Sequence, residues 1–173
     1  MKRILLIGNA PLPSDDTKTR PAAGLRTYQF LKPLMHESGK VADGIANAFG
    51  SHVNPSYAIG LVTIAMPECY ENEPEKKEII ESEKFAHLFI SKNDRGLMKA
   101  VQKFHDEFHP DAIVSVNTYP SYIASKLQST APMWADLNGW IMAEAQAQAH
   151  KMENNSYLSH YYNMERSVVA RAD

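Results

Sequence analysis

The sequence predicts an α/β fold with a mainly parallel sheet, and two observations support this prediction. Short, continuous apolar runs recur along the chain, and stretches with helical periodicity separate most of them. Strands that are apolar throughout are typical of parallel sheets covered on both faces. Strands that alternate with helices require right-handed crossovers between parallel strands. Together these observations predict a Rossmann-like three-layer sandwich.

The strands are expected in five apolar segments. Residues 3–8 and 59–66 have nearly continuous apolar character, and residues 111–117 are an equally strong candidate. Residues 86–91 are a weaker one. The fifth segment, 132–138, begins as a buried strand should and then loses its apolar character within three residues.

The helices are expected between these strands. Residues 25–36 carry apolar side chains at helical spacing, although Pro33 is expected to kink or shorten this helix. A second helix follows Asn93 and Asp94, which can cap it, and ends before Pro110. Its apolar face consists of Leu97, Val101, Phe104 and Phe108.

Further helices are expected toward the C-terminus. Residues 121–128 predict a short helix opened by Pro120, and the alanine- and glutamine-rich residues after Asn138 predict another. From Asn154 onward apolar residues recur at helical spacing until the chain stops at Asp173. A patterned helix that ends a chain without a glycine cap indicates a fragment of a longer protein.

Two segments do not follow the alternation. Residues 37–58 are rich in Gly, Asn, Ser and Ala, with weak helical character around residues 41–49. Residues 67–84 are charged and predict a solvated loop with one exposed helical turn. Since the sequence shows no internal repeat and no interdomain linker, residues 1–173 are expected to form one domain.

Composition excludes several classes of function. The chain has 173 residues, 44% of them hydrophobic, which is enough to bury a core. A net charge of −2 at pH 7 argues against binding to nucleic acid or to an acidic membrane surface. No apolar run approaches the length of a membrane span, and the run after Arg3 is too short for a signal peptide. The one cysteine, Cys69, fits a reducing compartment, so we expect a soluble, cytoplasmic protein.

The predicted fold also indicates where a ligand would bind. In open parallel sheets, ligands lie beyond the carboxyl ends of the strands, near a reversal in strand order. This rule selects three loops, at residues 8–28, 117–122 and 136–140. The first is too long for a tight turn, and loops of that length are usually functional or disordered.

In the first loop, Arg20, Gly24 and Arg26 lie where a helix N-terminus is expected. Guanidinium groups and free backbone N–H groups there would suit a phosphate or a carboxylate. The alternative is that both arginines are solvated surface charges and that Gly24 only begins the helix. The sequence contains no dinucleotide-binding fingerprint and no P-loop motif, so neither NAD-dependent nor P-loop chemistry is expected.

The two later loops offer polar groups. Asn117, Thr118 and Tyr119 end the fourth strand in hydrogen-bonding side chains, which suit ligand contacts or turn and helix-cap roles. Asn138 is expected to cap the helix that follows, and Gly139 beside it is a further candidate for ligand binding.

Asp136 is the catalytic candidate. Its carboxylate lies two residues before the expected helix cap, at the end of an inner strand. This position suits a general base, or hydrogen bonds to a polyhydroxyl ligand.

His105 and His109 lie four residues apart in the segment HDEFH, as histidines do in some zinc-binding helices. The residue after the first histidine is Asp rather than the Glu of H-E-x-x-H, and the helix dipole favours histidine near a helix C-terminus. A structural role is expected for both, and the sequence indicates neither a metal nor a cofactor.

Several segments together carry a family resemblance. The opening strand KRILLIGN, the loop ending GLRTYQFLKPL, the segment HPDAIVSVNTYPSYIASKL, the segment PMWADLNGW and the final MERSVVARAD occur in this order. In this order they resemble the N-terminal domain of GT-B glycosyltransferases of the glycosyltransferase family 4 type, over most of the chain.

The resemblance implies two Rossmann-like domains that face each other across a cleft. This chain would be the N-terminal, acceptor-side domain, truncated before the C-terminal domain that binds the donor. The parent protein would transfer a sugar from a nucleotide-sugar donor to an unknown acceptor without a metal, and this domain alone would be inactive.

The resemblance also implies roles for particular residues. Asp136 falls closest to the family's polar residue that reaches the sugar or the attacking hydroxyl. Gly24, with Arg20 and Arg26 beside it, maps onto the loop that approaches the donor phosphates. Where the family usually has a glycine pair, this loop reads AAGLR, with one glycine, and residues 37–58 look like an insertion.

Two other interpretations stay open. One is a stand-alone flavodoxin-like or receiver-like module that binds a small ligand. The segment GNAPLP lacks both the acid that a receiver domain needs after its first strand and the Ser/Thr-rich phosphate loop of a flavin-binding module. The other is half of a sugar-nucleotide epimerase with the same GT-B architecture.

Overall fold

The structure is a computed structural model that describes residues 1–38, 57–137 and 141–172. Within these residues a six-stranded sheet has the order β3-β4-β2-β1-β5-β6. All neighbouring strands pair in parallel except β3, which is antiparallel to β4. The strands are β1 (Lys2–Ala10), β2 (Tyr57–Ala65), β3 (Lys77–Ser82), β4 (Phe85–Ser91), β5 (Ala112–Val116) and β6 (Met133–Asp136).

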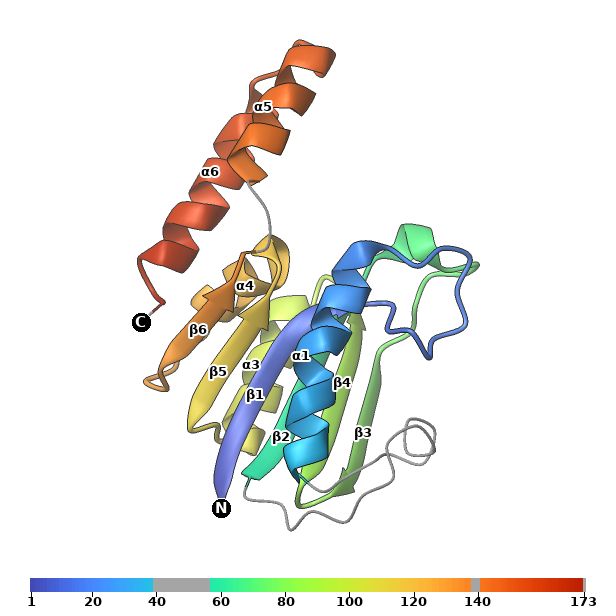
Figure 1. Cartoon of the computed structure of the whole chain (residues 1–173), viewed down its shortest axis with the longest axis vertical. Helices are drawn as coiled ribbons and strands as arrows, with labels where there is room; N and C mark the ends of the chain where they lie inside the picture. The colour runs from blue at the N-terminus through green and yellow to red at the C-terminus, as the bar shows by residue number, and fades with distance from the viewer. Residues whose placement is uncertain (39–56, 138–140, 173) are drawn as a thin grey trace.

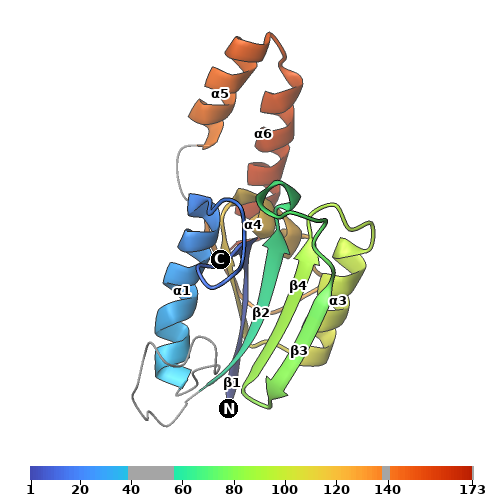
Figure 2. The same ribbon diagram turned by 90° about the vertical axis from the view of Figure 1, so that its right-hand side faces the viewer.

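Helices cover both faces of this sheet, which confirms the predicted three-layer α/β sandwich (Figures 1 and 2). The helix α1 packs on one face, and α3 and α4 pack on the other (Figure 2). The helices α5 and α6 form a hairpin that extends beyond the carboxyl ends of the strands, and α6 contacts α4 (Figure 1). The helices are α1 (Ala22–Ser38), α3 (Leu97–Phe108), α4 (Thr118–Ser125), α5 (Ile141–Met152) and α6 (Ser156–Val169).

The hydrophobic core is divided by the sheet into two clusters. In β1, Leu5 and Ile7 belong to the cluster under α3 and α4, whereas Leu6 belongs to the cluster under α1. Successive side chains of a strand point to opposite faces, so a strand buried on both faces must be apolar at every position. This is the physical reason for the continuous apolar run that the sequence shows at residues 3–8.

The strand order reverses at the centre of the sheet. The chain leaves β1 through α1 to β2 on one side, and it later returns through α3 to β5 on the other side. Because α1 and α3 lie on opposite faces, the carboxyl ends of β1 and β5 are the place where open α/β sheets generally bind ligands. The residues that follow β1 and β5 are therefore the candidates for a ligand-binding site.

The prediction for residues 67–84 was right about a helical turn and wrong about the loop after it, part of which is a strand. Pro67–Cys69 form a short 3-10 helix, and Lys77–Ser82 form the strand β3 at the edge of the sheet. Nearly the whole strand is exposed, and the side chain of Ile80 is 73% exposed. A charged, exposed edge strand lacks the apolar run that reveals an inner strand, and charges at an edge discourage pairing with other chains.

Two helix boundaries also differ from the prediction. The short helix covers Thr118–Ser125 rather than residues 121–128, because Asn117 alone makes the turn from β5, with a φ of 72°. The helix α1 begins at Ala22 and continues past Pro33 to Ser38. Pro33 is exposed, so water can satisfy the carbonyl that loses its helical partner.

Some predictions fall outside the described residues: the weak helical segment at residues 41–49, and the candidate residues Asn138 and Gly139. Among the helices that the structure describes, none combines the length and the apolar character needed to cross a membrane.

Candidate functional site

The first turn of α1 lies directly against the loop that follows β1. A Cβ atom at Gly24 would lie 1.7 Å from the carbonyl oxygen of Pro11, and that oxygen belongs to the backbone and cannot move aside. Gly24 is therefore required because α1 and this loop approach so closely. Its role is to hold the loop at the carboxyl edge of the sheet.

Asn117 joins the two strands that flank the strand-order reversal. Its side-chain amide donates to the Oδ1 of Asn9 and to the backbone carbonyl of Ala23, at 3.0 Å each. The backbone N–H of Asn9 donates to the Oγ1 of Thr27 at 2.9 Å, and that hydroxyl donates to the carbonyl of Ala23 at 3.1 Å. The ends of β1 and β5 and the start of α1 are thus held together by one polar network.

Asp136 lies at the end of β6, and the prediction that this strand is an inner one was wrong, because β6 is an edge strand of the sheet. The side chain of Asp136 is paired with Arg26 of α1. The guanidinium Nε donates to Asp136 Oδ2 at 2.8 Å, and Nη2 donates to Oδ1 at 3.3 Å. The hydrogen bond to Asp136 raises the pKa of Arg26 above its usual value. The backbone carbonyl of Asp136 also accepts a hydrogen bond from the N–H of Asn117, at 2.8 Å. Of the predicted site residues, Arg26 and Asp136 are therefore in direct contact, and Asn117 is hydrogen-bonded to Asp136.

An aromatic surface continues from this ion pair. The guanidinium of Arg26 lies 5.0 Å from the centre of the Phe30 ring, and Phe30 lies 5.4 Å from the Trp134 ring. The side chain of Trp134 is 50% exposed although it lies on a strand. A half-exposed tryptophan beside a charged pair offers both an apolar face and hydrogen-bonding groups to a ligand.

The first turn of α4 contains two buried hydroxyl groups that have no hydrogen-bond partner among the residues that the structure describes. Thr118 is 3% exposed and Ser121 is fully buried, and the Oγ atoms of both are unsatisfied. Unsatisfied buried hydroxyls are uncommon in folded proteins, and a ligand or an ordered water often completes their hydrogen bonding. Tyr119 has a pKa raised by burial, and its ring lies 4.9 Å from the ammonium of Lys92.

Arg20 does not contribute to the Arg26–Asp136 pair. Its side chain is exposed, and its charge acts on Asp15 in the loop after β1. The pKa of Asp15 is nevertheless raised, mainly because burial disfavours the ionised carboxylate.

The sequence analysis missed four contributors to this site: Asn9, Thr27, Phe30 and Trp134. Asn9 and Trp134 carry a sequence signal, since each is an unexpected residue near the end of a predicted buried strand. Thr27 and Phe30 carry none, because they look like ordinary residues of an amphipathic helix. Whether Thr27 and Phe30 contribute to the site depends on which face of α1 meets the ends of β1 and β6.

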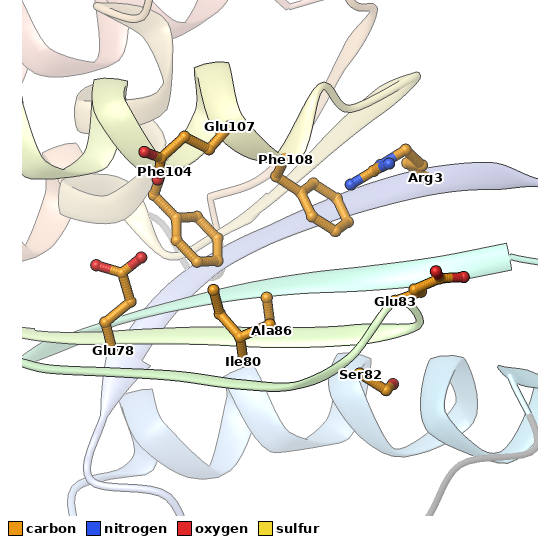
Figure 3. A pocket seen from close by; sticks show the side chains of 9 residues that line it. All are labelled: Arg3, Glu78, Ile80, Ser82, Glu83, Ala86, Phe104, Glu107 and Phe108. Carbon is orange, nitrogen blue, oxygen red and sulfur yellow. The ribbon is translucent and has the colours of Figure 1, made fainter.

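Two cavities lie away from these residues. One of about 660 Å³ opens over β3 and β4 beside Asp15, Tyr70 and His87. The other, of about 240 Å³, lies between α3 and the strands β3 and β4. Figure 3 shows Phe104 and Phe108 pointing from α3 into this second cavity, with Arg3 beside Phe108. No predicted site residue lines either cavity.

The described residues contain no group of three or more His, Cys, Asp or Glu side chains arranged to hold a metal ion. Neither a protein-family model nor a curated protein matches this chain.

Proposed function

We propose that this chain is the acceptor-side domain of a cytoplasmic GT-B glycosyltransferase, which transfers a sugar from a nucleotide-sugar donor to an acceptor not yet identified. One observation carries the proposal. Asp136, Arg26 and Asn117 come from three distant parts of the chain and meet at the carboxyl edge of the sheet, beside the strand-order reversal. This edge is where open α/β sheets bind ligands.

Asp136 acts as the general base that takes the proton of the attacking acceptor hydroxyl. Its pairing with Arg26 fixes the position of the carboxylate at the carboxyl edge of the sheet. The Asp136 side chain is 15% exposed, so an acceptor hydroxyl can reach it. A carboxylate has lone pairs for about four hydrogen bonds, so a hydroxyl can bind while Arg26 stays in place.

Arg26 and the aromatic surface position the substrate. The Arg26 side chain is 37% exposed, and its guanidinium suits an anionic group such as a donor phosphate. The exposed Trp134 suits the apolar face of a sugar ring, because tryptophan combines a large apolar surface with a polar N–H.

The donor site belongs to a second domain, so residues 1–173 alone are expected to be inactive. In the full-length protein the cleft between the two domains excludes water and places the donor over Asp136. Without that domain the same edge of the sheet serves as a binding site for part of the substrate only.

The test is sugar transfer by the full-length protein across a panel of nucleotide-sugar donors. Asp136→Ala is expected to lower turnover by about 10²–10⁴-fold, the usual contribution of a general base. Asp111→Ala is the matched control, because Asp111 also lies beside a strand but accepts the Arg3 N–H at the opposite edge of the sheet.

Turnover that survives in Asp136→Ala would remove Asp136 from the mechanism. No turnover with any donor, together with ligand binding at the same edge, would support a stand-alone binding module instead.

A further inference from the structure

A second cluster of reactive side chains lies at the amino edge of the sheet, opposite the site described above. His105, in the last turn of α3, makes two short hydrogen bonds through its ring. Its Nδ1 lies 2.8 Å from Asp106 Oδ1, and its Nε2 lies 2.8 Å from the Oγ of Ser129, in the loop between α4 and β6. Two consecutive hydrogen bonds thus link Asp106, His105 and Ser129. The sequence predicted only a structural role for His105.

The partners determine the direction of these hydrogen bonds. An ionised Asp106 can only accept, so His105 Nδ1 carries the proton and Nε2 is left as an acceptor. Ser129 then donates its hydroxyl proton to Nε2. The backbone N–H of Ala131 donates to Ser129 Oγ at 3.2 Å, which occupies a lone pair of that oxygen and leaves the proton free for His105. This is the arrangement in which an imidazole activates a serine.

Neighbouring groups hold the cluster in position. Gln102 Nε2 donates to Asp106 Oδ1 at 2.7 Å, and Gln102 Oε1 accepts the backbone N–H of Gln128 at 2.9 Å. The hydrogen bonds from His105 and Gln102 lower the pKa of Asp106, which keeps its carboxylate ionised.

The loop that carries Ser129 is fixed from the other side by the C-terminal segment. Arg171 Nη2 donates to the backbone carbonyls of Ser129 at 3.2 Å and Ala131 at 2.7 Å. The serine is therefore held between α3 and the residues that follow α6.

The cluster opens onto a cavity. His105 and Ser129 both line a hollow of about 500 Å³, together with polar neighbours that include His109, Gln128 and Thr130. The His105 side chain is nearly buried, whereas Ser129 is partly exposed and can be reached from solvent. A shallow hollow with polar walls suits a short acyl group and not a long apolar chain.

We propose that Ser129 is a nucleophile, activated by His105 and positioned by Asp106, that reacts with short-chain carboxylic esters. Ser129 Oγ attacks the ester carbonyl carbon as its proton passes to His105 Nε2. The ester C–O bond then breaks, and the alcohol leaves with that proton. A water molecule, deprotonated by His105, next attacks the acyl-serine, which releases the carboxylic acid and restores the serine. This site is at the opposite edge from Asp136 and does not depend on the proposed sugar transfer.

The test is covalent labelling by a fluorophosphonate, followed by intact-protein and peptide mass spectrometry. In this reaction the Ser129 Oγ–P bond forms, the P–F bond breaks, fluoride leaves, and His105 takes the hydroxyl proton. The wild-type chain is expected to gain one phosphonyl group, on Ser129. Ser129→Ala and His105→Gln are expected to gain none. Asp106→Asn, at an exposed position, is expected to fold normally and to react at least tenfold more slowly.

Ser125→Ala is the matched control, because Ser125 is a nearby, partly buried serine that donates to the carbonyl of Tyr122 and lies outside the cluster. It is expected to be labelled as fast as the wild type. Thermal unfolding of each variant separates loss of reactivity from loss of fold. An unlabelled wild-type chain, a label on another residue, or a Ser129 label that Asp106→Asn does not slow would overturn the proposal and leave the cluster as a structural link.

Discussion

At the scale of single residues, the candidate site depends on pairs that are distant in sequence. Arg26 and Asp136 are 110 residues apart, and Asn9 and Asn117 are 108 apart. The sequence identified Asp136, Arg26 and Asn117 separately, because each stands where a ligand-binding loop was expected. It could not pair them, since the pairing depends on the order of strands in the sheet and on the rotation of α1. Arg20 has the same chemistry as Arg26 but lies outside the pair.

His87 is a partly buried residue that gives the stability of the protein a measurable pH dependence. Burial lowers its pKa from 6.5 to about 4, and its Nε2 lies 2.8 Å from the hydroxyl of Thr63. Between these two pH values the unfolded chain binds a proton at this position and the folded chain does not. The contribution of neutral His87 to the free energy of unfolding is therefore fully present above pH 6.5, and it is lost as the pH falls toward 4.

We predict that the free energy of unfolding of the wild type falls by about 3 kcal/mol more than that of His87→Gln over this range. Urea denaturation at a series of pH values measures this difference. Parallel pH profiles for the two proteins would show that His87 is protonated equally in the folded and unfolded states.

At the scale of the elements, the inner strands were predictable and the edge strand β3 was not. The inner strands β1 and β2 are buried on both faces, so their apolar character is continuous in the sequence. The strand β3 is exposed at nearly every residue, and its sequence KEIIES is indistinguishable from a charged loop. The start of α4 was also missed, because a single residue with positive φ, Asn117, replaced the longer turn that Pro120 suggested. Single-residue turns of this kind leave little trace in a sequence.

The contact between α1 and the loop after β1 gives a test at this scale. Gly24→Ala would place a Cβ atom 1.7 Å from the Pro11 carbonyl oxygen, so either the loop or the helix must move. We expect a loss of more than about 2 kcal/mol in the free energy of unfolding. Gly96→Ala is the control, because a Cβ atom there would meet only the side-chain Oδ1 of Asp94, at 3.2 Å. Urea denaturation of both variants measures the difference, and equal losses would contradict the close approach.

At the scale of the whole molecule, the two proposed sites lie at opposite edges of the sheet. The carboxyl edge carries Asp136, Arg26 and Asn117, where the strand order reverses. The amino edge carries Ser129 and His105, which come from the loops and helix ends before β5 and β6. The sequence predicted the first edge through the general rule for open parallel sheets. It could not predict the second, because Ser129 and His105 are 24 residues apart and match no motif.

The measurement that most directly tests the central claim is chemical-shift mapping of the isotope-labelled chain by NMR. The titrants are a nucleotide-sugar panel and a panel of free mono- and oligosaccharides. The account predicts that a ligand from these panels shifts the amides of Asn9, Arg26, Asn117 and Asp136 at the carboxyl edge, and that Asp136→Ala weakens its binding. Shifts confined to the amino edge, or no shift with any titrant, would contradict it.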